Sequence, residues 1–421
     1  MAFDTAISGI RAATADLGVI GNNIANSSTT GFKTSRAEFA DIYATSLLGA
    51  GGNAIGQGVA LAGVTQEFSQ GNVSFTNNAL DLAISGNGFF MLSDDGAALY
   101  TRAGSFKVDR EGYIVSNDGH RLQAFQADGA GNIGTQLGDL QLNTALIDPQ
   151  ATGLVDVTAN LDSRQVAPAV PFGGPFDAFA VPPTAPDPDS YNGTTSATIY
   201  DSLGNPHVMS MFFVKTANAN EWEVHSTIDG VTSSGATTLN FQSNGQFDPA
   251  TLPVELNITG WNPLNSEGSP TGAEVQDFNV SLSRSTQFGS ELSVSSIIQD
   301  GFSTGQLRGL EFDETGVAFA RYTNGQSRAL GQVAVAGFSN ANGLQPLGDT
   351  SWAETFSSGQ ASLAQAGTSG LGVIQSGALE DSNVEITEQL VNMIVAQRNF
   401  QANAQVIQTE DTITQTVINL R

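Results

Sequence analysis

The chain has no cysteine, little charge and no long apolar run, and each shortage excludes a class of protein. Without cysteine there are no disulfides, thiolate metal sites or cysteine nucleophiles. No stretch approaches the roughly 18 consecutive apolar residues of a membrane-spanning helix. The first residues also lack the basic and continuous apolar regions of a cleaved secretion signal. We therefore expect no membrane insertion and, if the chain is exported, no cleaved signal peptide.

Charged residues make up 13% of the chain, against roughly 25% in an average domain. The formal net charge is −26, and the lysines are limited to Lys33, Lys107 and Lys215. Nucleic acids and anionic membranes bind surfaces rich in lysine and arginine, so this composition excludes a nucleic-acid partner.

Proline is concentrated in one stretch, which marks domain boundaries. Thirteen of the 14 prolines fall within residues 149–270, and residues 149–298 carry 15 acidic residues against three basic ones. A composition shift on both sides of a segment is typical of an inserted domain. Apolar residues alternate or cluster as in β-strands at 196–200, 208–214, 221–228 and 275–282. The sequence therefore predicts an inserted outer β domain at 149–298.

The segments that flank this insert also predict β-strands. Gly-containing pairs such as Asp95-Gly96 and Asp118-Gly119 separate short apolar runs, as they do in tight hairpins. The same pattern returns beyond the insert, with turns at Thr315-Gly316 and Asn324-Gly325. We expect residues 71–148 and 299–360 to be the two halves of one split β domain.

The two ends of the chain differ from everything between them, because each predicts a long helix without proline. Residues 1–26 and 384–421 form these helices, and Ser382 or Asn383 is a candidate cap for the second. Gly-rich connectors are expected at 49–63 and 359–377. Segments 1–70 and 361–421 would then form the two halves of a discontinuous coiled-coil domain. The predicted fold is mainly β, with a split β domain, an inserted β domain and this helical domain.

Each terminal helix carries an imperfect apolar stripe with steps of four and three residues. Helices with such weak stripes are marginal alone, so we expect them to pack against each other and against other copies of the chain. The predicted packing residues are Phe3, Ile7, Ile10, Leu17, Ile24, Ile386, Leu390, Met393, Phe400, Ala404, Ile407 and Ile418.

No pattern predicts catalysis or a cofactor. The histidines, His120, His207 and His225, accompany no Gly-x-Ser-x-Gly elbow, so a catalytic role is disfavoured. The acidic turns lack the ligand spacing of a calcium-binding loop. The Gly-rich segment lacks the Gly-Lys-Ser/Thr ending of a phosphate loop. We expect no catalytic residue, no cofactor and no metal, hence a structural subunit and not an enzyme.

Motifs at both ends resemble those of bacterial flagellar rod and hook proteins. The N-terminal motif contains Gly21, Asn22, Asn23, Ile24, Ala25, Asn26, Gly31 and Phe32. Near the other end, Gly377-Ala378-Leu379-Glu380, the run from Glu388 to Phe400 and the ending Ile418-Asn419-Leu420-Arg421 look like the flagellar hook family in particular. The size of the insert also favours hook over rod.

This resemblance implies a curved extracellular tube that transmits motor torque to the filament and encloses the export channel. It implies three radial zones, with the helices inside, the split domain next and the insert outside. It also implies partners: further copies of the chain, the rod below, the hook–filament junction above, the hook cap during assembly and the flagellar export apparatus. Two alternatives stay open, namely a rod protein with an enlarged insert and, more remotely, a secreted β-rich adhesin or hydrolase.

Two polar features of the helices have more than one interpretation. Asn22, Asn23 and Asn26 either end the first helix in a polar turn or bond to other copies. The last helix carries a second stripe of neutral polar residues, which could face an export channel or simply follow from the low charge of the chain. Its members are Gln401, Gln405, Gln408, Thr412, Gln415 and Asn419.

Overall fold

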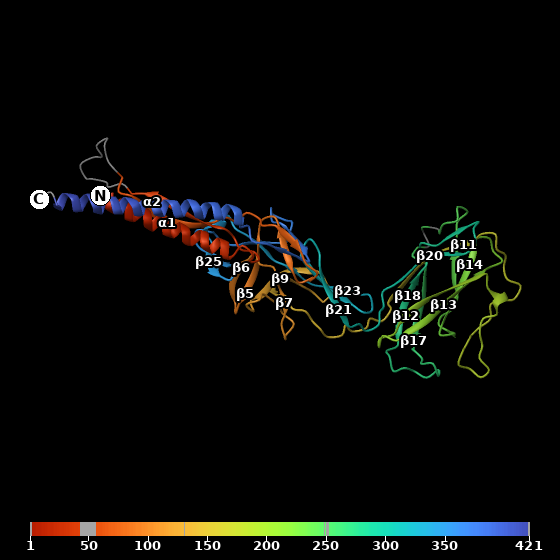
Figure 1. Cartoon of the computed structure of the whole chain (residues 1–421). Coiled ribbons are helices and arrows are strands. Elements are labelled where there is room, and N and C mark those ends of the chain that lie inside the picture. Colours follow the sequence, from red (N-terminus) through yellow and green to blue (C-terminus); the bar gives the residue numbers. More distant parts are fainter. Residues whose placement is uncertain (1, 43–55, 130, 248, 250–251, 420–421) are drawn as a thin grey trace. The chain divides into compact units, whose positions relative to one another are not determined.

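The computed structural model describes residues 2–42, 56–129, 131–247, 249 and 252–419. The chain divides into two compact units (Figure 1). Unit 1 is drawn from both ends of the chain, as Met1–Thr144, Arg308–Arg321 and Ser327–Arg421. Unit 2 comprises Ala145–Leu307 and Tyr322–Gln326, where the sequence predicted an insert at 149–298.

The two terminal helices pair within unit 1, as the sequence predicted. They are α1 (Ala2–Ala25) and α2 (Ile386–Asn419), and they run side by side in Figure 1. Gly9 lies against Asn403, while Asn23 donates a hydrogen bond to Gln389. Because an early residue of α1 meets a late residue of α2, the pair is antiparallel, and Figure 1 shows α2 continuing beyond the start of α1.

A hairpin that the sequence did not predict follows α1. Its strands are β1 (Ser35–Asp41) and β2 (Val59–Gln66), and it is tied to α1 where the Val59 amide donates to Ser8 Oγ at 3.2 Å. The predicted connector at 49–63 is therefore wrong from Val59 onward, while residues 49–55 lie outside the described residues. Glycine content alone does not make this segment flexible, because residues 59–64 are mostly apolar and have a strand partner.

The main sheet of unit 1 joins strands from both sides of the insert, which confirms the split β domain. Its strand order is β21-β22-β23-β9-β5-β6-β26-β25, and every pairing from β22 to β25 along this order is antiparallel. The strands of this path are β5 (Phe89–Asp94), β6 (Ala97–Thr101), β9 (Arg121–Ala127), β21 (Leu307–Phe312), β22 (Val317–Tyr322), β23 (Ser327–Val333), β25 (Gln345–Gly348) and β26 (Ser351–Ala353). Further strands beside it are β7 (Lys107–Val108), β8 (Ile114–Val115), β10 (Ile133–Asp139) and β24 (Val335–Gly337).

The second predicted connector, 359–377, is also wrong, because it contains strands. They are β27 (Ser362–Ala364) and β28 (Val373–Ser376), followed by β29 (Ala378–Glu380). These pair with β24, β4 (Leu82–Ser85) and β3 (Val73–Phe75), respectively. The strands are three or four residues long, which is too short to show alternation in the sequence.

Unit 2 consists of two five-stranded sheets around one apolar core. The first sheet contains β11 (Leu154–Asp162), β17 (Glu255–Trp261), β18 (Gln276–Ser281), β19 (Thr286–Phe288) and β20 (Ser293–Gln299). The second contains β12 (Gly193–Tyr200), β13 (Pro206–Lys215), β14 (Glu221–Ile228), β15 (Val231–Thr232) and β16 (Thr237–Asn240). Alternate residues of β11 and β13, such as Val155, Val157, Met209 and Met211, are buried in this core. Such alternation is typical of a β-sandwich.

Candidate assembly site

The contact between α1 and α2 is built mainly from small side chains. Among the side chains that the structure describes, Ala6, Ala13 and Ile20 are the buried apolar residues of α1, and Ala396 is that of α2. At Gly9 an added Cβ would lie 2.5 Å from Asn403 Oδ1, so a larger residue there would require the Asn403 side chain to move. The small residues allow the helix backbones to come close, which stiffens the pair.

The predicted apolar stripe is offset by about one position from these most buried residues. On α1 the seam residues precede the predicted ones by one position, as Ala6 precedes Ile7, and on α2 Gln389 precedes Leu390. Among the predicted packing residues, the exposed ones are Phe3, Ile386, Leu390, Phe400 and Ile418, and the half-buried ones are Ile7, Ile10, Leu17, Ile24, Met393, Ala404 and Ile407. The stripe follows large apolar residues, whereas three of the four fully buried apolar positions among the described residues of the pair are alanines.

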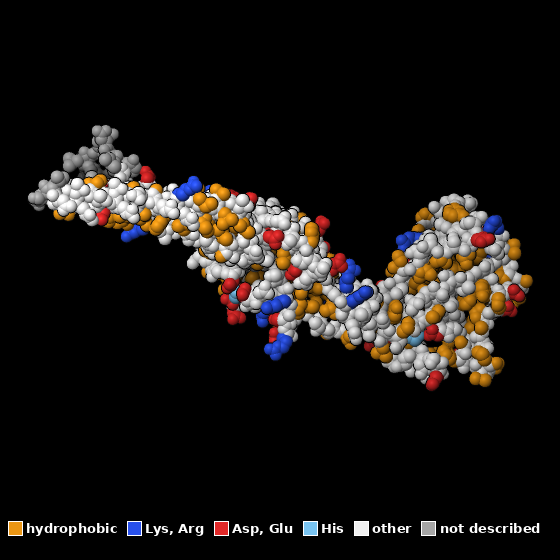
Figure 2. Space-filling view, in the orientation of Figure 1, with side chains coloured by type: hydrophobic (Ala, Val, Ile, Leu, Met, Phe, Trp, Pro, Cys, Tyr) orange, Lys and Arg blue, Asp and Glu red, His pale blue; other side chains and the backbone are white. Residues whose placement is uncertain are grey.

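Large apolar side chains therefore remain uncovered along α2. Leu390 is 48% exposed, and Val391, Ile394 and Val395 beside it are similarly open. Figure 2 shows hydrophobic side chains at the surface of this part of unit 1, with few charges among them. Contiguous exposed apolar side chains on one helix indicate a surface that another molecule covers.

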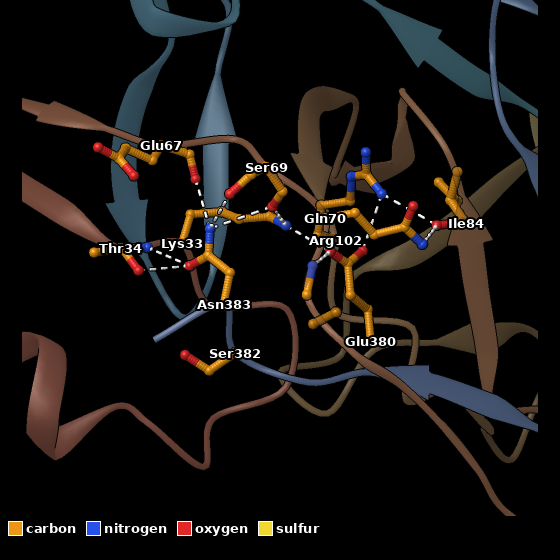
Figure 3. A network of polar contacts seen from close by, with 12 residues as sticks. Lys33, Thr34, Glu67, Ser69, Gln70, Ile84, Arg102, Glu380, Ser382 and Asn383 are labelled. Carbon is orange, nitrogen blue, oxygen red and sulfur yellow. Dashed lines mark hydrogen bonds and ion pairs between the residues drawn. The ribbon is translucent and has the colours of Figure 1, made fainter. Parts of the chain in front are cut away.

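At the base of the helix pair, three buried charges tie the terminal segments to the β domain (Figure 3). Glu380 accepts from Lys33 Nζ at 2.5 Å, from Arg102 Nη1 at 2.9 Å and from the Gly71 amide at 2.9 Å. The Lys33 ammonium also donates to the Ser69 carbonyl, and the Arg102 guanidinium donates to the Ile84 and Gly86 carbonyls. All three charged side chains are almost fully buried.

This cluster carries two cations against one carboxylate. Burial lowers the pKa of the Lys33 ammonium, Glu380 opposes that shift, and Arg102 adds to it. Burial likewise lowers the pKa of Arg102 against the attraction of Glu380. Glu380 is thus the single counter-charge that lets both cations stay in a water-poor site.

Asn383 links the same segments and does not cap α2, so that predicted role is wrong. Its Oδ1 accepts from the Thr34 amide and hydroxyl at 2.7 Å each, and its Nδ2 donates to the Glu67 carbonyl and to Ser69. The Ser382 hydroxyl accepts from the Val384 amide, before the helix begins. A side chain with long-range partners was not free to form a local cap.

The motif asparagines have partners inside the chain. Asn23 is buried, exchanges hydrogen bonds with the Ser35 backbone and donates to Gln389. Asn26 donates to the Asn22 carbonyl and side chain, and the Asn26 side chain accepts from Thr29. These contacts form the polar turn that ends α1, one of the two interpretations of the motif.

The glycine of the motif at position 31 is required by space and by backbone conformation. Gly31 has φ +71°, and an added Cβ would lie 2.4 Å from the Ala103 amide nitrogen. Its amide donates to the Glu380 carbonyl at 2.8 Å, while the next residue, Phe32, is half-buried. Gly21 differs, because nothing lies within 4 Å of the position that a Cβ would occupy there, and Ile24 and Ala25 are likewise not fully buried.

The neutral polar stripe of α2 is exposed at the surface of the single chain. Gln401, Gln405, Gln408, Thr412, Gln415 and Asn419 are all exposed. The Thr412 hydroxyl donates a hydrogen bond to the Gln408 carbonyl, as threonine does on a free helix face.

Within the described part of the chain, no group of three or more metal-ligating side chains could hold an ion. No helix among the described residues has the length and apolar character that a bilayer crossing needs.

The chain matches family models of flagellar rod and hook proteins over most of its length. The description "Flagella basal body rod protein" matches residues 3–33 and "Flagellar hook protein FlgE/F/G D1 domain" matches 83–160. "Flagellar basal body protein FlaE D2 domain" matches 160–302 and "Flagellar basal body rod FlgEFG protein C-terminal" matches 375–420. The fold and its helical base thus define a flagellar axial protein.

Full-length relatives identify the member of that class. The flagellar hook proteins FlgE of Escherichia coli strain K12 and of Salmonella typhimurium are 38% and 39% identical to the chain, each over 100% of both sequences. That of Borreliella burgdorferi is 35% identical, over 99% of this chain and 98% of its own. The chain belongs to the flagellar hook protein family, a family of structural subunits.

A solved structure shares the fold. The crystal structure of Helicobacter pylori flagellar hook protein FlgE2 aligns with a TM-score of 0.52 and 14% identity, covering 73% of this chain and all of that one.

Proposed function

We propose that copies of this chain polymerise through their terminal helices into the curved tube of the flagellar hook. The observation that carries the proposal is the uncovered apolar surface of α2 around Leu390. In a single chain this surface contacts water, and in a tube of parallel subunits a neighbouring helix pair would cover it. The predicted packing residues from Phe3 to Ile418 are proposed to act at that contact.

The tube is proposed to transmit torque while its outer surfaces slide. The buried cluster at Lys33, Arg102 and Glu380 supports this, because it fixes the helix pair rigidly to the β domain of the same subunit. The low charge of the chain supports sliding, since neutral contacts can be exchanged without breaking specific ion pairs. We propose that the insert sets curvature and stiffness, and that the three radial zones expected from the sequence apply.

The proposed partners are those of a hook subunit. They are other copies of the chain, the rod below, the hook–filament junction above, the cap during growth and the export apparatus. Export without a cleaved signal is part of the same proposal. No catalysis and no cofactor is assigned.

Electron microscopy of purified chain tests the polymer. We expect the full chain to form curved tubes, and a chain ending at Glu385, which lacks α2, to stay a monomer with a folded β-sandwich. The truncation removes the apolar surface but none of the residues of unit 2. Straight tubes would favour the rod alternative, and tubes from the truncated chain would contradict assembly through the helices.

A second prediction concerns the polar stripe, which we propose lines the bore. Replacing Gln401, Gln405 and Gln408 together by leucine should leave tube formation intact but slow the passage of unfolded subunits, because apolar segments would adhere to the wall. The measurement is filament growth rate on hooks built from the variant. The same number of leucines at exposed positions of unit 2 provides the control, and unchanged growth would show that the stripe faces away from the bore.

A further inference from the structure

A buried histidine occupies a core-facing position in unit 2. His207 begins the inward alternation of β13 that continues with Met209, Met211 and Phe213, and its side chain is only 5% exposed. An apolar residue is usual at such a position, so a polar ring there requires partners.

Two carboxylates supply those partners, one to each ring nitrogen. His207 Nδ1 lies 2.6 Å from Asp229 Oδ2, and Nε2 lies 3.5 Å from Asp201 Oδ2. The second distance is that of an ion pair and not of a normal hydrogen bond. The His207 ring also packs against Trp261 of β17 in a T-shaped arrangement, with the ring centroids 5.0 Å apart. The indole of Trp261 does not titrate in this pH range. Asp201 and Asp229 are the charged groups that act on the ring from the packed elements.

This arrangement suits only one protonation state. A carboxylate accepts hydrogen bonds and cannot donate them, whereas neutral imidazole has one N–H and one lone pair. Neutral His207 would therefore direct a lone pair at Asp201, while the imidazolium presents an N–H to each carboxylate. Asp201 is fully buried: burial raises its pKa, but hydrogen bonds from Asn205 and Leu203, together with the nearby His207 ring, outweigh burial and lower it.

Each carboxylate also holds a surface turn. Asp201 accepts from the Leu203 and Asn205 amides and from the Asn205 side chain, which closes the turn before β13. Asp229 has φ +50° in the turn between β14 and β15, and its Oδ1 accepts from the Val208 amide. Through the ring, two turns far apart in sequence depend on one another.

We propose that His207 links the turns of Asp201 and Asp229 in a pH-dependent way, a contact called the clasp below. The clasp is closed while the imidazole ring is protonated and opens when the ring loses its proton. The turns it joins lie at the surface, as exposed Leu203 in the first and the partly exposed Asp229 side chain in the second show. Opening therefore loosens one surface region of unit 2 and leaves the apolar core in place. The clasp belongs to the single chain and does not depend on the proposed assembly.

The sign of the pH dependence follows from the contacts. Burial lowers the pKa of His207, but Asp229 and Asp201 together raise it above its ordinary 6.5. A group whose pKa is higher in the folded than in the unfolded protein stabilises the fold. This stabilisation is complete at pH values below the unfolded-state pKa, and it is lost as the pH rises through the folded-state pKa. The contribution of His207 to the stability of unit 2 should therefore be larger near pH 6 than near pH 9.

The test is proton NMR of the three histidine C2–H signals of the full chain, kept below its assembly concentration, across pH 5–9. His225 provides an internal contrast, because burial against Phe172 lowers its pKa despite the attraction of Glu223. We expect His207 to titrate above 6.5 and His225 below it, with signals assigned from His120→Gln and His225→Gln.

Asp229→Asn is the critical variant, since asparagine tolerates the same backbone conformation. It should move the His207 midpoint downward and reduce the difference in unit 2 unfolding between pH 6 and pH 9. Asp94→Asn, near His120 in unit 1, is the matched control and should change neither. A His207 midpoint at or below 6.5, or one that Asp229→Asn leaves in place, would overturn the clasp.

Discussion

Glu380→Gln should destabilise unit 1 by about 3–5 kcal/mol, the usual cost of removing one partner from a buried ion pair. Both oxygens of Glu380 accept, Oε1 from Lys33 and Gly71 and Oε2 from Arg102. Glutamine has an NH2 group in place of one carboxylate oxygen. That group would face either the donors of Lys33 and Gly71 or the donor of Arg102, and two donors cannot bond to each other. It would also leave Lys33 and Arg102 buried without a counter-charge.

Urea unfolding of the full chain, followed by near-ultraviolet circular dichroism, measures this loss. Glu385→Gln makes the same chemical change at an exposed position of the same segment, and it should alter stability by less than about 0.5 kcal/mol. Lys33→Met combined with Glu380→Gln should be less damaging than Glu380→Gln alone, because it removes one of the stranded cations. Equal stability of Glu380→Gln and wild type would mean that the cluster is not a structural joint.

The elements predictable from the sequence were those with a local signal. The strand predicted at 221–228 coincides with β14 (Glu221–Ile228), because its apolar residues alternate and turns bound it. By contrast, residues 82–92 contain one nearly continuous apolar pattern in the sequence, yet they form two strands, β4 and β5, since Gly86 and Gly88 adopt φ +116° and +126° between them. The pairing of the terminal helices was also predictable, because no other long helix was expected from the sequence to cover either one.

The site itself was mostly unpredictable because its parts lie far apart in the chain. Lys33 and Glu380 are separated by 347 positions, and neither has a local pattern that indicates a buried ion pair. The seam between α1 and α2 was missed for another reason, namely that Ala6, Gly9 and Ala13 contribute close approach and not apolar bulk. The contacts of His207 have no local signal either, because its two carboxylates come from separate turns.

The surface of α2 provides the prediction with the largest effect on assembly. Leu390→Asp should leave the single chain folded, because Leu390 is 48% exposed and surface substitutions usually change stability by less than about 0.5 kcal/mol. In the proposed tube the same position is covered, and an unpaired carboxylate there costs several kcal/mol. A penalty of about 3 kcal/mol at one contact raises the concentration needed for assembly about 100-fold.

Light scattering and electron microscopy of the purified chains measure that concentration. Asn399→Asp adds the same charge at an exposed polar position of α2 and should assemble close to the wild-type concentration. Leu390→Met keeps the apolar volume and should do the same. If Leu390→Asp forms tubes at the wild-type concentration while its circular dichroism is unchanged, Leu390 faces water in the polymer. The contact between copies would then have to use another face of the helix pair. Exposed Phe3 on α1 would be the next residue to substitute.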